Sequence, residues 1–378
     1  MNKKEISEIR KQFTDAHCTI SRICGCYVDA DKNKVADFAG SFLTLPDEEC
    51  VKYYEIFRKV LSGSIGKNLM NMDFPLEAEM EGGKQAFLLS LRDTALKDEE
   101  LVDAYYEKVI SSFEYVGNYL ILLIHAAYDV PGRSSDNLEM DDASDEVYSY
   151  ILSAVCPVSL EKPALSYDAD EQCFHDRVRD WIVSAPELGF LFPAFNDRST
   201  DIHSLLFYTK NAKNQHEEFN EALLSCPLPL PGPSQQEVFA DVIEETLGEA
   251  CTFEMIRGLH DQIHELTERA KESPDPVVLQ QGEVKNLLSL AGADTEQIQQ
   301  FDKTFEETAG SEAVFMPTNL RGNQKFEVQM PDVQIKVSPD RSDLIQTRKI
   351  DGRDCLVIAI SDDVTVNGIR VRPESNEA

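Results

Sequence analysis

Cys226-Pro227-Leu228-Pro229-Leu230-Pro231-Gly232-Pro233 divides the chain into two parts of different character. Four prolines in eight residues exclude a helix interior and a central strand, because proline lacks the backbone N–H that both structures use. Helical and strand patterns are mixed before this octet, whereas the sequence after it is first helical. We therefore predict a linker over residues 223–236, with a domain boundary inside it.

Residues 1–222 are predicted to form a mixed α/β domain. Strands are expected over residues 20–28, 119–130, 150–158 and 189–208, and helices at the N-terminus, after Pro46, over 83–94 and over 98–113. Three acidic residues follow Pro46, in the first turn of a helix, where the positive end of the helix dipole favours them. Because helices and strands alternate irregularly, the pattern favours an α+β fold over a doubly wound sheet.

A helical segment is predicted over residues 237–315. Ser234 and Glu237 have the spacing of a capping box, which marks the start of a helix. Apolar residues then recur every three or four positions, at Ile256, Leu259, Ile263 and Leu266. Ser273-Pro274-Asp275-Pro276 interrupts this periodicity once.

Residues 316–372 are predicted to form a small antiparallel β domain. Apolar and polar residues alternate from Phe326 and again from Val333, as expected for half-buried strands. Asp351-Gly352 and Asn367-Gly368 are typical two-residue hairpin turns. The continuously apolar stretch Cys355–Ile360 predicts the central strand of this domain.

The charge of the chain restricts its partners. Thirty-six basic and 68 acidic side chains leave a net charge of −32, which argues against a protein that coats polyanions. Residues 320–378 are nearly balanced, and this predicts that the C-terminal domain offers the only face for nucleic acid. The candidate contacts there are Lys336, Arg348, Lys349 and Arg353, with Arg341, Arg370 and Arg372 nearby. The alternative is that these are ordinary surface charges.

Cysteine usage and hydropathy favour a cytoplasmic protein without a membrane segment. The nine cysteines are scattered along the chain, which is typical of free thiols in a reducing compartment. The N-terminal residues are charged and lack the apolar stretch of a signal peptide. The most apolar run, Tyr119–Tyr128, is too short to span a bilayer as a helix.

Three short motifs suggest metal or phosphate binding. Cys24 and Cys26 would share one face of a strand, but no second pair of ligands accompanies them, so buried thiols are favoured. His260 and His264 lie one helical turn apart without a third ligand, which favours a solvated helix edge. Gly63–Asn68 lacks the spacing of a phosphate-binding loop. No metal or cofactor is predicted.

The densest polar cluster, residues 196–203, lies between two apolar runs. Polar groups at the tip of a rigid scaffold are often binding or catalytic groups. Asp201 and His203 would share a strand face, so that the carboxylate could orient the imidazole as a base. The candidate catalytic residues are Asp197, Arg198, Asp201, His203 and, on another apolar strand, His125. A hydrogen-bonded hairpin turn is the structural alternative.

Five stretches of the chain carry a resemblance to known sequences: Met1–Ile6, Arg22–Val28, Gly66–Leu69, His125–Gly132 and Leu191–Ser204. Together they resemble one uncharacterised bacterial family of Firmicutes type, domain of unknown function 4317. This resemblance covers nearly the whole chain and implies no established activity, ligand or catalytic residue.

The order of parts also resembles that of the bacterial 37-kDa nucleoid-associated proteins. An α/β half is followed by a Leu-Leu-x-Cys stretch near Cys226, by helices and by terminal strands with Phe326, Val328, Val333 and Ile335 in a similar pattern. Such a likeness of fold does not by itself assign a function.

Two hypotheses of function follow. The first is a non-enzymatic cytoplasmic protein that acts through association with an unknown protein partner or with the nucleoid. The alternative is a hydrolase or nucleotide-processing enzyme that uses the Asn196–His203 cluster. An enzyme requires these groups to converge in one concave pocket, whereas a binding protein does not.

Overall fold

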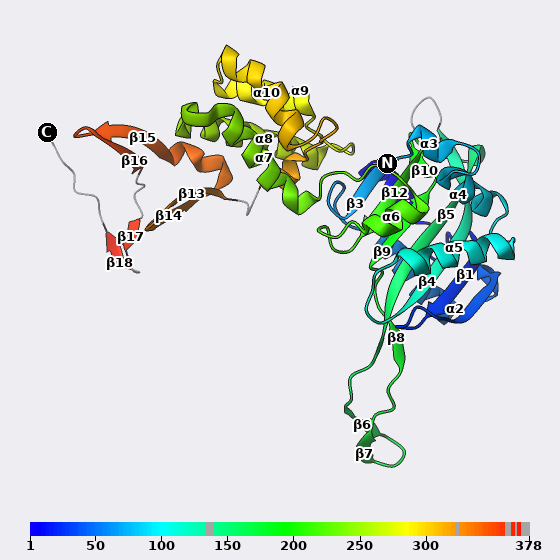
Figure 1. Ribbon diagram of the computed structural model, residues 1–378. Helices are drawn as coiled ribbons and strands as arrows, with labels where there is room; N and C mark the ends of the chain where they lie inside the picture. Colours follow the sequence, from blue (N-terminus) through cyan, green and yellow to red (C-terminus); the bar gives the residue numbers. More distant parts are fainter. Residues whose placement is uncertain (134–138, 322–324, 360–363, 367–368, 372–378) are drawn as a thin grey trace. The chain divides into compact units, whose positions relative to one another are not determined.

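The computed structural model describes residues 1–133, 139–321, 325–359, 364–366 and 369–371 (Figure 1). The chain forms two compact units. The first comprises Met1–Ser234 with Pro274–Pro276, and the second comprises Gln235–Ser273 with Val277–Ala378. Among the described residues, no helix has both the length and the apolar character needed to cross a membrane.

An eight-stranded sheet forms the centre of the first unit, in the order β2-β1-β4-β5-β9-β12-β3, with β8 paired to β5 outside this path. The pairings between these strands are antiparallel, as an α+β fold predicts. The strands are β1 (Ile20–Val28), β2 (Lys34–Ser41), β3 (Leu69–Asp73), β4 (Asn118–Arg133), β5 (Glu139–Leu160), β8 (Trp181–Val183), β9 (Leu188–Phe192) and β12 (Ser204–Thr209).

Helices cover both faces of this sheet. Residues of α1 (Lys3–Arg10) and α2 (Asp47–Val60) belong to the core on one face. Residues of α4 (Lys84–Asp93), α5 (Glu99–Ser112) and α6 (Glu217–Leu223) belong to the core on the other, and the short α3 (Leu76–Glu79) precedes α4. The helices expected after Pro46, over 83–94 and over 98–113 are thus confirmed.

Strand β4 explains why the most apolar run of the chain does not alternate. Ile121 and Leu123 point into one core, and Leu122 and Ile124 point into the other. All four side chains are fully buried. A strand with helices on both faces needs apolar residues at every position, so the run Tyr119–Tyr128 belongs to a central strand.

A hairpin arm extends from the first unit over residues 161–184. Its tip is formed by β6 (Leu165–Asp168) and β7 (Cys173–Asp176), and β8 returns the chain to the sheet beside β5 (Figure 1). No pattern in the sequence indicated this arm. A smaller hairpin, β10 (Ala194–Asn196) with β11 (Ser199–Asp201), follows β9.

The second unit combines helices with three separate two-stranded sheets. The helices are α7 (Gly232–Leu247), whose first residues precede the unit boundary, α8 (Phe253–Glu272), α9 (Gln281–Ala291), α10 (Thr295–Thr308) and α11 (Pro317–Leu320). The sheets are β13 (Phe326–Met330) with β14 (Val333–Val337), β15 (Ile345–Ile350) with β16 (Arg353–Ile358), and β17 (Val364–Val366) with β18 (Ile369–Val371). The predicted order of a mixed α/β half, helices and small antiparallel sheets is confirmed.

The two units divide between Ser234 and Gln235, inside residues 223–236, and both the core of the first unit and helix α7 extend into this predicted linker. Leu223, Leu224 and Cys226 are buried in the core of the first unit, so that core extends past residue 222. Helix α7 begins at Gly232 and not near residue 237. Pro233 fits there because the N–H groups of a first helical turn have no intrahelical partner.

The C-terminal strands also differ from expectation. Among the described residues, β16 pairs with β15 alone, so the part of Cys355–Ile360 that belongs to β16 is not a central strand. Phe326 contacts Phe253 of α8, and the helices and hairpins belong to one compact unit. Asp351-Gly352 does form the predicted turn, with positive φ at both residues. Ile360, Asn367-Gly368 and Arg372 lie outside the described residues.

Candidate anion-binding groove

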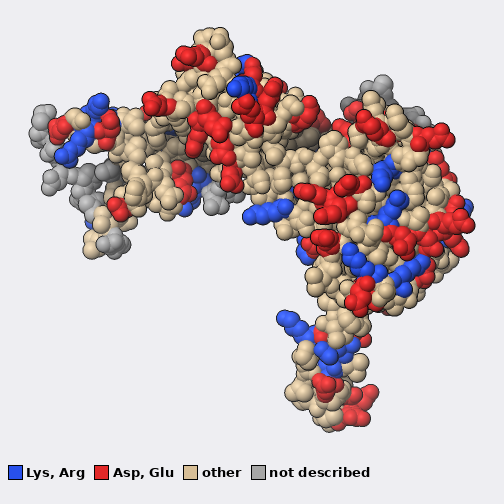
Figure 2. Space-filling view, in the orientation of Figure 1, with Lys and Arg blue, Asp and Glu red and all other residues tan. Residues whose placement is uncertain are grey.

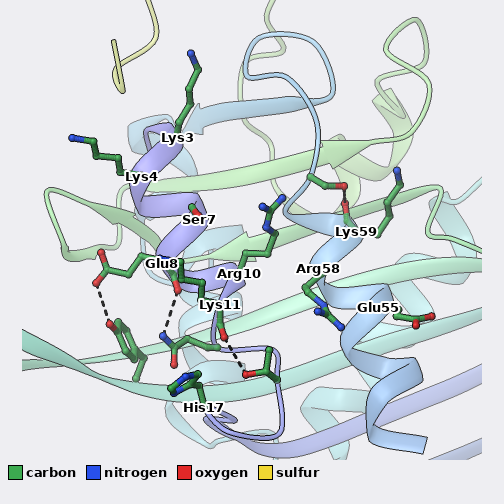
Figure 3. Close-up of a pocket in the computed structure, with 14 residues that line it drawn as sticks. Lys3, Lys4, Ser7, Glu8, Arg10, Lys11, His17, Glu55, Arg58 and Lys59 are labelled. Carbon is green, nitrogen blue, oxygen red and sulfur yellow. Dashed lines mark hydrogen bonds between the residues drawn. The ribbon is translucent and has the colours of Figure 1, made fainter. Parts of the chain in front are cut away.

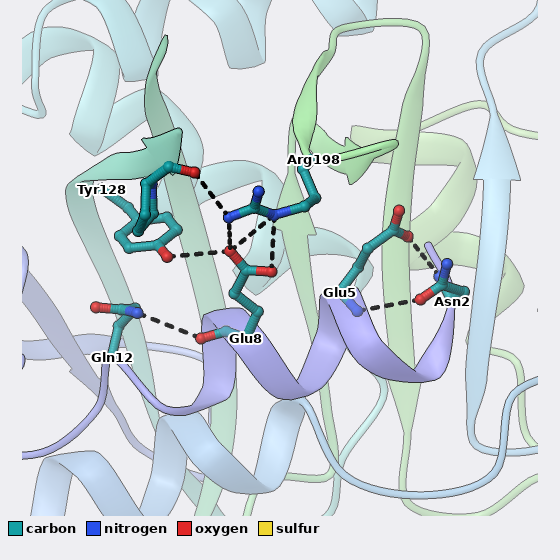
Figure 4. A network of polar contacts seen from close by, with 7 residues as sticks. Asn2, Glu5, Glu8, Gln12, Tyr128 and Arg198 are labelled. Atoms are coloured by element: carbon teal, nitrogen blue, oxygen red, sulfur yellow. Dashed lines mark hydrogen bonds and ion pairs between the residues drawn. The ribbon is translucent and has the colours of Figure 1, made fainter. Parts of the chain in front are cut away.

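The 196–203 cluster is built on the β10–β11 hairpin. Asp197 and Arg198 both have positive φ, as the central residues of a type I′ turn require. The backbone N–H of Asp197 donates to a carboxylate oxygen of Glu5 at 2.8 Å. The guanidinium of Arg198 binds both carboxylate oxygens of Glu8, with a shortest distance of 2.9 Å (Figure 4). The turn therefore holds the inner face of α1.

The acidic residues on that inner face have further partners. Tyr128 donates its hydroxyl to Glu8 at 3.0 Å (Figure 4). Glu5 accepts from the backbone of Asn2 at 2.7 Å, and the Asn2 side chain accepts from the backbone of Glu5, which completes a capping box. These contacts compensate both carboxylates and fix the position of the helix.

Asp201 and His203 do not form the expected acid–base pair. The carboxylate of Asp201 accepts from the Asn196 amide at 2.7 Å, the Ser204 hydroxyl at 2.8 Å and the backbone N–H of His203 at 3.0 Å. Burial opposes ionisation of Asp201, but these hydrogen bonds outweigh it and leave the pKa below its ordinary value. The His203 imidazole instead contacts Glu79 at 2.7 Å and is exposed. That contact raises the pKa of His203.

His125 is held by neighbouring strands, apart from this hairpin. Its two ring nitrogens contact the hydroxyls of Ser21 at 2.6 Å and Ser149 at 3.0 Å. Burial lowers the pKa of His125, and the charges of Arg92 and Lys97 lower it further. The imidazole is therefore a satisfied polar group of the sheet.

Side chains of α1, of α2 and of the chain that follows each helix line an open hollow of about 1220 Å³ (Figure 3). Its cationic lining consists of Lys3, Lys4, Arg10, Lys11, Arg58 and Lys59. Glu8 and Glu55 are the acidic residues among its lining residues, and Glu8 is paired with Arg198. We call this hollow the α1–α2 groove.

Helical spacing directs these cations to one side. One face of α1 and its C-terminal end carries Lys3, Ser7, Arg10 and Lys11. They share this face because they follow one another at intervals of four, three and one positions. On α2, Glu55, Arg58 and Lys59 likewise lie at helical spacing on one face, and Ser62 follows just after the end of the helix. Each helix directs its apolar positions toward the sheet, so the basic positions of the groove face outward.

The cations of the groove are largely uncompensated. Among the described residues, Lys4, Arg10, Lys11 and Lys59 form no ion pair, and Arg58 donates to the carbonyl of Tyr54 in its own helix. Six basic side chains against one unpaired carboxylate create a local positive field in a chain of net charge −32.

The four basic residues proposed for the C-terminal strands lie on β14, β15 and β16. Lys336 pairs with Glu327 at 3.3 Å, Lys349 lies 3.9 Å from Asp354, and Arg348 donates to Gln346. Arg353 lies beside the turn and is exposed. This region is not the only cationic surface of the chain, because the lining of the α1–α2 groove holds six lysines and arginines against two carboxylates.

The short cysteine and histidine motifs lie in packed parts of the structure. Cys24 and Cys26 are buried in the core, and burial raises the pKa of Cys26 to about 11. His260 and His264 do not form a solvated edge, because both are half-buried beside a cavity of about 390 Å³ within the second unit. His260 contacts the ring of Phe326 at 4.8 Å.

Fold and groove together define an acidic α+β protein with a basic groove on one helical layer. The chain belongs to the family described as domain of unknown function (DUF4317), whose model matches residues 1–369. This confirms the family membership expected from the sequence. No curated protein matches the chain.

Sequence reasoning missed the groove because its cations are divided between two distant segments. A signal was present in each: basic residues recur at helical spacing at positions 3, 4, 10 and 11, and again at 58 and 59. What could not be read from the sequence is that these two helices lie on the same face of one sheet.

Proposed function

We propose that this protein binds a phosphate-bearing polyanion, specifically nucleic acid, along the α1–α2 groove, and that it acts in the bacterial cytoplasm by association and not by catalysis. The observation that carries the proposal is the gathering of six lysines and arginines around one hollow of an otherwise acidic chain. Such cations would contact phosphates and release condensed counterions.

The lining favours a polyanion over a small molecule. Sites for small ligands are enclosed and mostly apolar, with a few placed polar groups. The groove is instead lined mainly by charged and hydroxyl-bearing side chains, with Tyr128 and His17 as its ring-bearing residues. Cations distributed along an open groove match the repeated charges of a nucleic acid backbone.

The acidic remainder of the chain limits how such a ligand can approach. Charges separated by more than about 8 Å are largely screened at physiological ionic strength, so the local field of the groove dominates close contact. Away from the groove, like charges oppose binding. The footprint should therefore be short, covering the two helices and little more.

The alternative, a hydrolase or nucleotide-processing enzyme, has less support from the geometry. Arg198 forms an ion pair with Glu8, the Asp201 carboxylate already accepts hydrogen bonds from its neighbours, and His203 contacts Glu79. General acid–base catalysis requires groups that converge on a substrate position. Here, most of these groups instead organise the hairpin and α1.

Fluorescence anisotropy with a labelled single-stranded oligonucleotide, measured over a salt series, tests the proposal. We expect binding that weakens steeply with salt. Arg10→Ala combined with Arg58→Ala should weaken it about tenfold and lower the salt slope by about 1.4, because each phosphate contact to a single strand contributes about 0.7.

Lys336→Ala combined with Lys349→Ala is the matched control, since it removes the same charge from the C-terminal strands. It should leave binding unchanged. Absence of salt-sensitive binding by the wild type would contradict the proposal, and so would equal losses in both variants. A polyglutamate chain that binds while the oligonucleotide does not would assign the groove to an acidic protein segment.

A further inference from the structure

The hairpin arm has one apolar and one polar face. In its register, Tyr167 lies opposite Phe174, with ring centroids 5.2 Å apart, and Leu165 lies opposite Asp176. Residues directly opposite in an antiparallel pair share a face, as do alternate residues along a strand. Leu165, Tyr167 and Phe174 therefore lie on one largely apolar face, with Asp176 at its edge, and the other face carries Ser166, Asp168, Cys173 and His175.

This apolar face is exposed to an unusual degree. Leu165 is 73%, Tyr167 55% and Phe174 69% exposed, and four more large apolar side chains of the arm are exposed: Val178, Trp181, Ile182 and Val183. Exposed apolar side chains that gather on one surface in this way mark an interaction site.

Charge is distributed unevenly along the arm. The tip carries four acidic residues: Asp168, Asp170, Glu171 and Asp176. The stem carries three basic residues, Lys162, Arg177 and Arg179, against Glu161 and Asp180. Arg177 pairs with Glu161, which leaves the charges of Lys162 and Arg179 without an ion pair among the described residues. Figure 2 shows the acidic tip and the basic stem.

We propose that the arms of two copies of this chain pack antiparallel against each other through their apolar faces, and form a two-fold dimer. In this arrangement the acidic tip of one arm lies beside the basic stem of the other, and the symmetry produces the contact twice. A two-stranded hairpin is marginally stable in water by itself, and the second arm supplies the missing layer.

The first experiment measures the oligomeric state of the full chain by sedimentation, with tryptophan fluorescence in parallel. Trp181, on the arm, is the single tryptophan of the chain, so its emission reports on this surface alone. We expect a monomer–dimer equilibrium and a blue shift of the emission as the dimer forms. Tyr167→Ser with Phe174→Ser should abolish both. A wild type that remains monomeric at all concentrations would overturn the proposal.

Charge reversal distinguishes a second copy from any other partner. Lys162→Glu with Arg179→Glu makes the whole arm acidic, and Asp170→Lys with Glu171→Lys makes the tip basic like the stem. Each variant alone should dimerise about tenfold more weakly, because like charges then face each other. An equimolar mixture of the two should restore dimerisation as a heterodimer.

The control is Lys52→Glu with Lys67→Glu, two exposed lysines of the same unit outside the arm. It should dimerise as the wild type does. Because all of these positions are exposed, thermal unfolding should be nearly unchanged in each variant. A mixture that stays monomeric, or a control that weakens the dimer equally, would overturn the antiparallel arrangement.

Discussion

At the residue scale, two histidines show how the environment decides the role of a side chain. His203 is exposed and contacts a carboxylate, whereas His125 is buried between two hydroxyls. A nearby negative charge favours the imidazolium, and burial disfavours it. The two groups therefore titrate in opposite directions from the ordinary pKa of histidine.

Replacing Glu79 should lower the pKa of His203. Its hydrogen bond to Glu79, with the charge of that carboxylate, raises the pKa in the folded protein. The stabilising effect of this pair is therefore present at low pH and is lost as the pH rises through the folded pKa. An NMR titration of the imidazole should give a value above the ordinary one in the wild type and close to it in Glu79→Gln. An unshifted wild-type value would show that the contact does not persist in solution.

The buried His125 should make the protein less stable in weak acid. Burial holds its pKa below the ordinary value, so the folded state binds fewer protons than the unfolded state. Its effect on stability is absent above the unfolded pKa of about 6.5 and becomes destabilising as the pH falls below it. Urea unfolding between neutral and weakly acidic pH should show this loss, and His125→Gln should reduce it. If the stability of His125→Gln fell with pH as steeply as that of the wild type, His125 would be excluded as the source of the loss.

At the scale of elements, α1 is a short helix that depends on tertiary contacts. Eight residues are too few for a helix to be stable in isolation. Ile6 and Ile9 anchor it in the core, and Glu5 and Glu8 attach it to the β10–β11 turn. The polar cluster that resembles a catalytic site therefore positions the helix that carries half of the groove.

Arg198→Ala should destabilise the first unit by about 1.5–3 kcal/mol, the range for hydrogen bonds to charged groups, because Glu8 would lose its bidentate partner. The pair is only 16% and 21% exposed, so solvent screens it little. Urea unfolding measures the change. Lys210→Ala is the control: its ion pair with Glu187 is more exposed, and its loss should cost about 1 kcal/mol or less. Equal losses of unfolding free energy in the two variants would mean that the Arg198–Glu8 pair stabilises the protein no more than a surface ion pair does.

At the scale of the whole molecule, the first unit has a self-contained core. Both of its apolar clusters draw their buried residues from positions 1–226. The second unit has its own buried residues, with Phe315 in contact with both Phe239 and Phe305. Each unit therefore meets the main requirement for an independently folding domain.

A chain of residues 1–231 should fold by itself, whereas residues 1–222 should be markedly less stable. The shorter chain lacks Leu223 and Leu224, which are fully buried, and Cys226, which is nearly so. Loss of a buried leucine costs about 2–5 kcal/mol through lost burial and an unfilled cavity. Circular dichroism with urea unfolding compares the two chains. Equal stability would place the boundary at residue 222 after all.

Local patterns in the sequence were sufficient to predict several helices, one turn and the broad organisation of the chain. Proline density placed the change of character near residues 226–233, and apolar periodicity located α2, α4 and α5. The Asp351-Gly352 turn was equally readable, because positive φ restricts which residues can occupy it. These features depend on a few neighbouring residues, so a local pattern is sufficient to predict them.

Contacts between groups that are distant in the sequence depend on the tertiary structure. It paired Arg198 with Glu8, 190 residues away, and His203 with Glu79, so that the expected Asp201–His203 pair did not form. It also brought the cations of α1 beside those of α2. Such contacts depend on strand order and on which sheet face each helix covers. Both are set by the burial of apolar surface over the whole unit, and no short stretch of sequence contains that information.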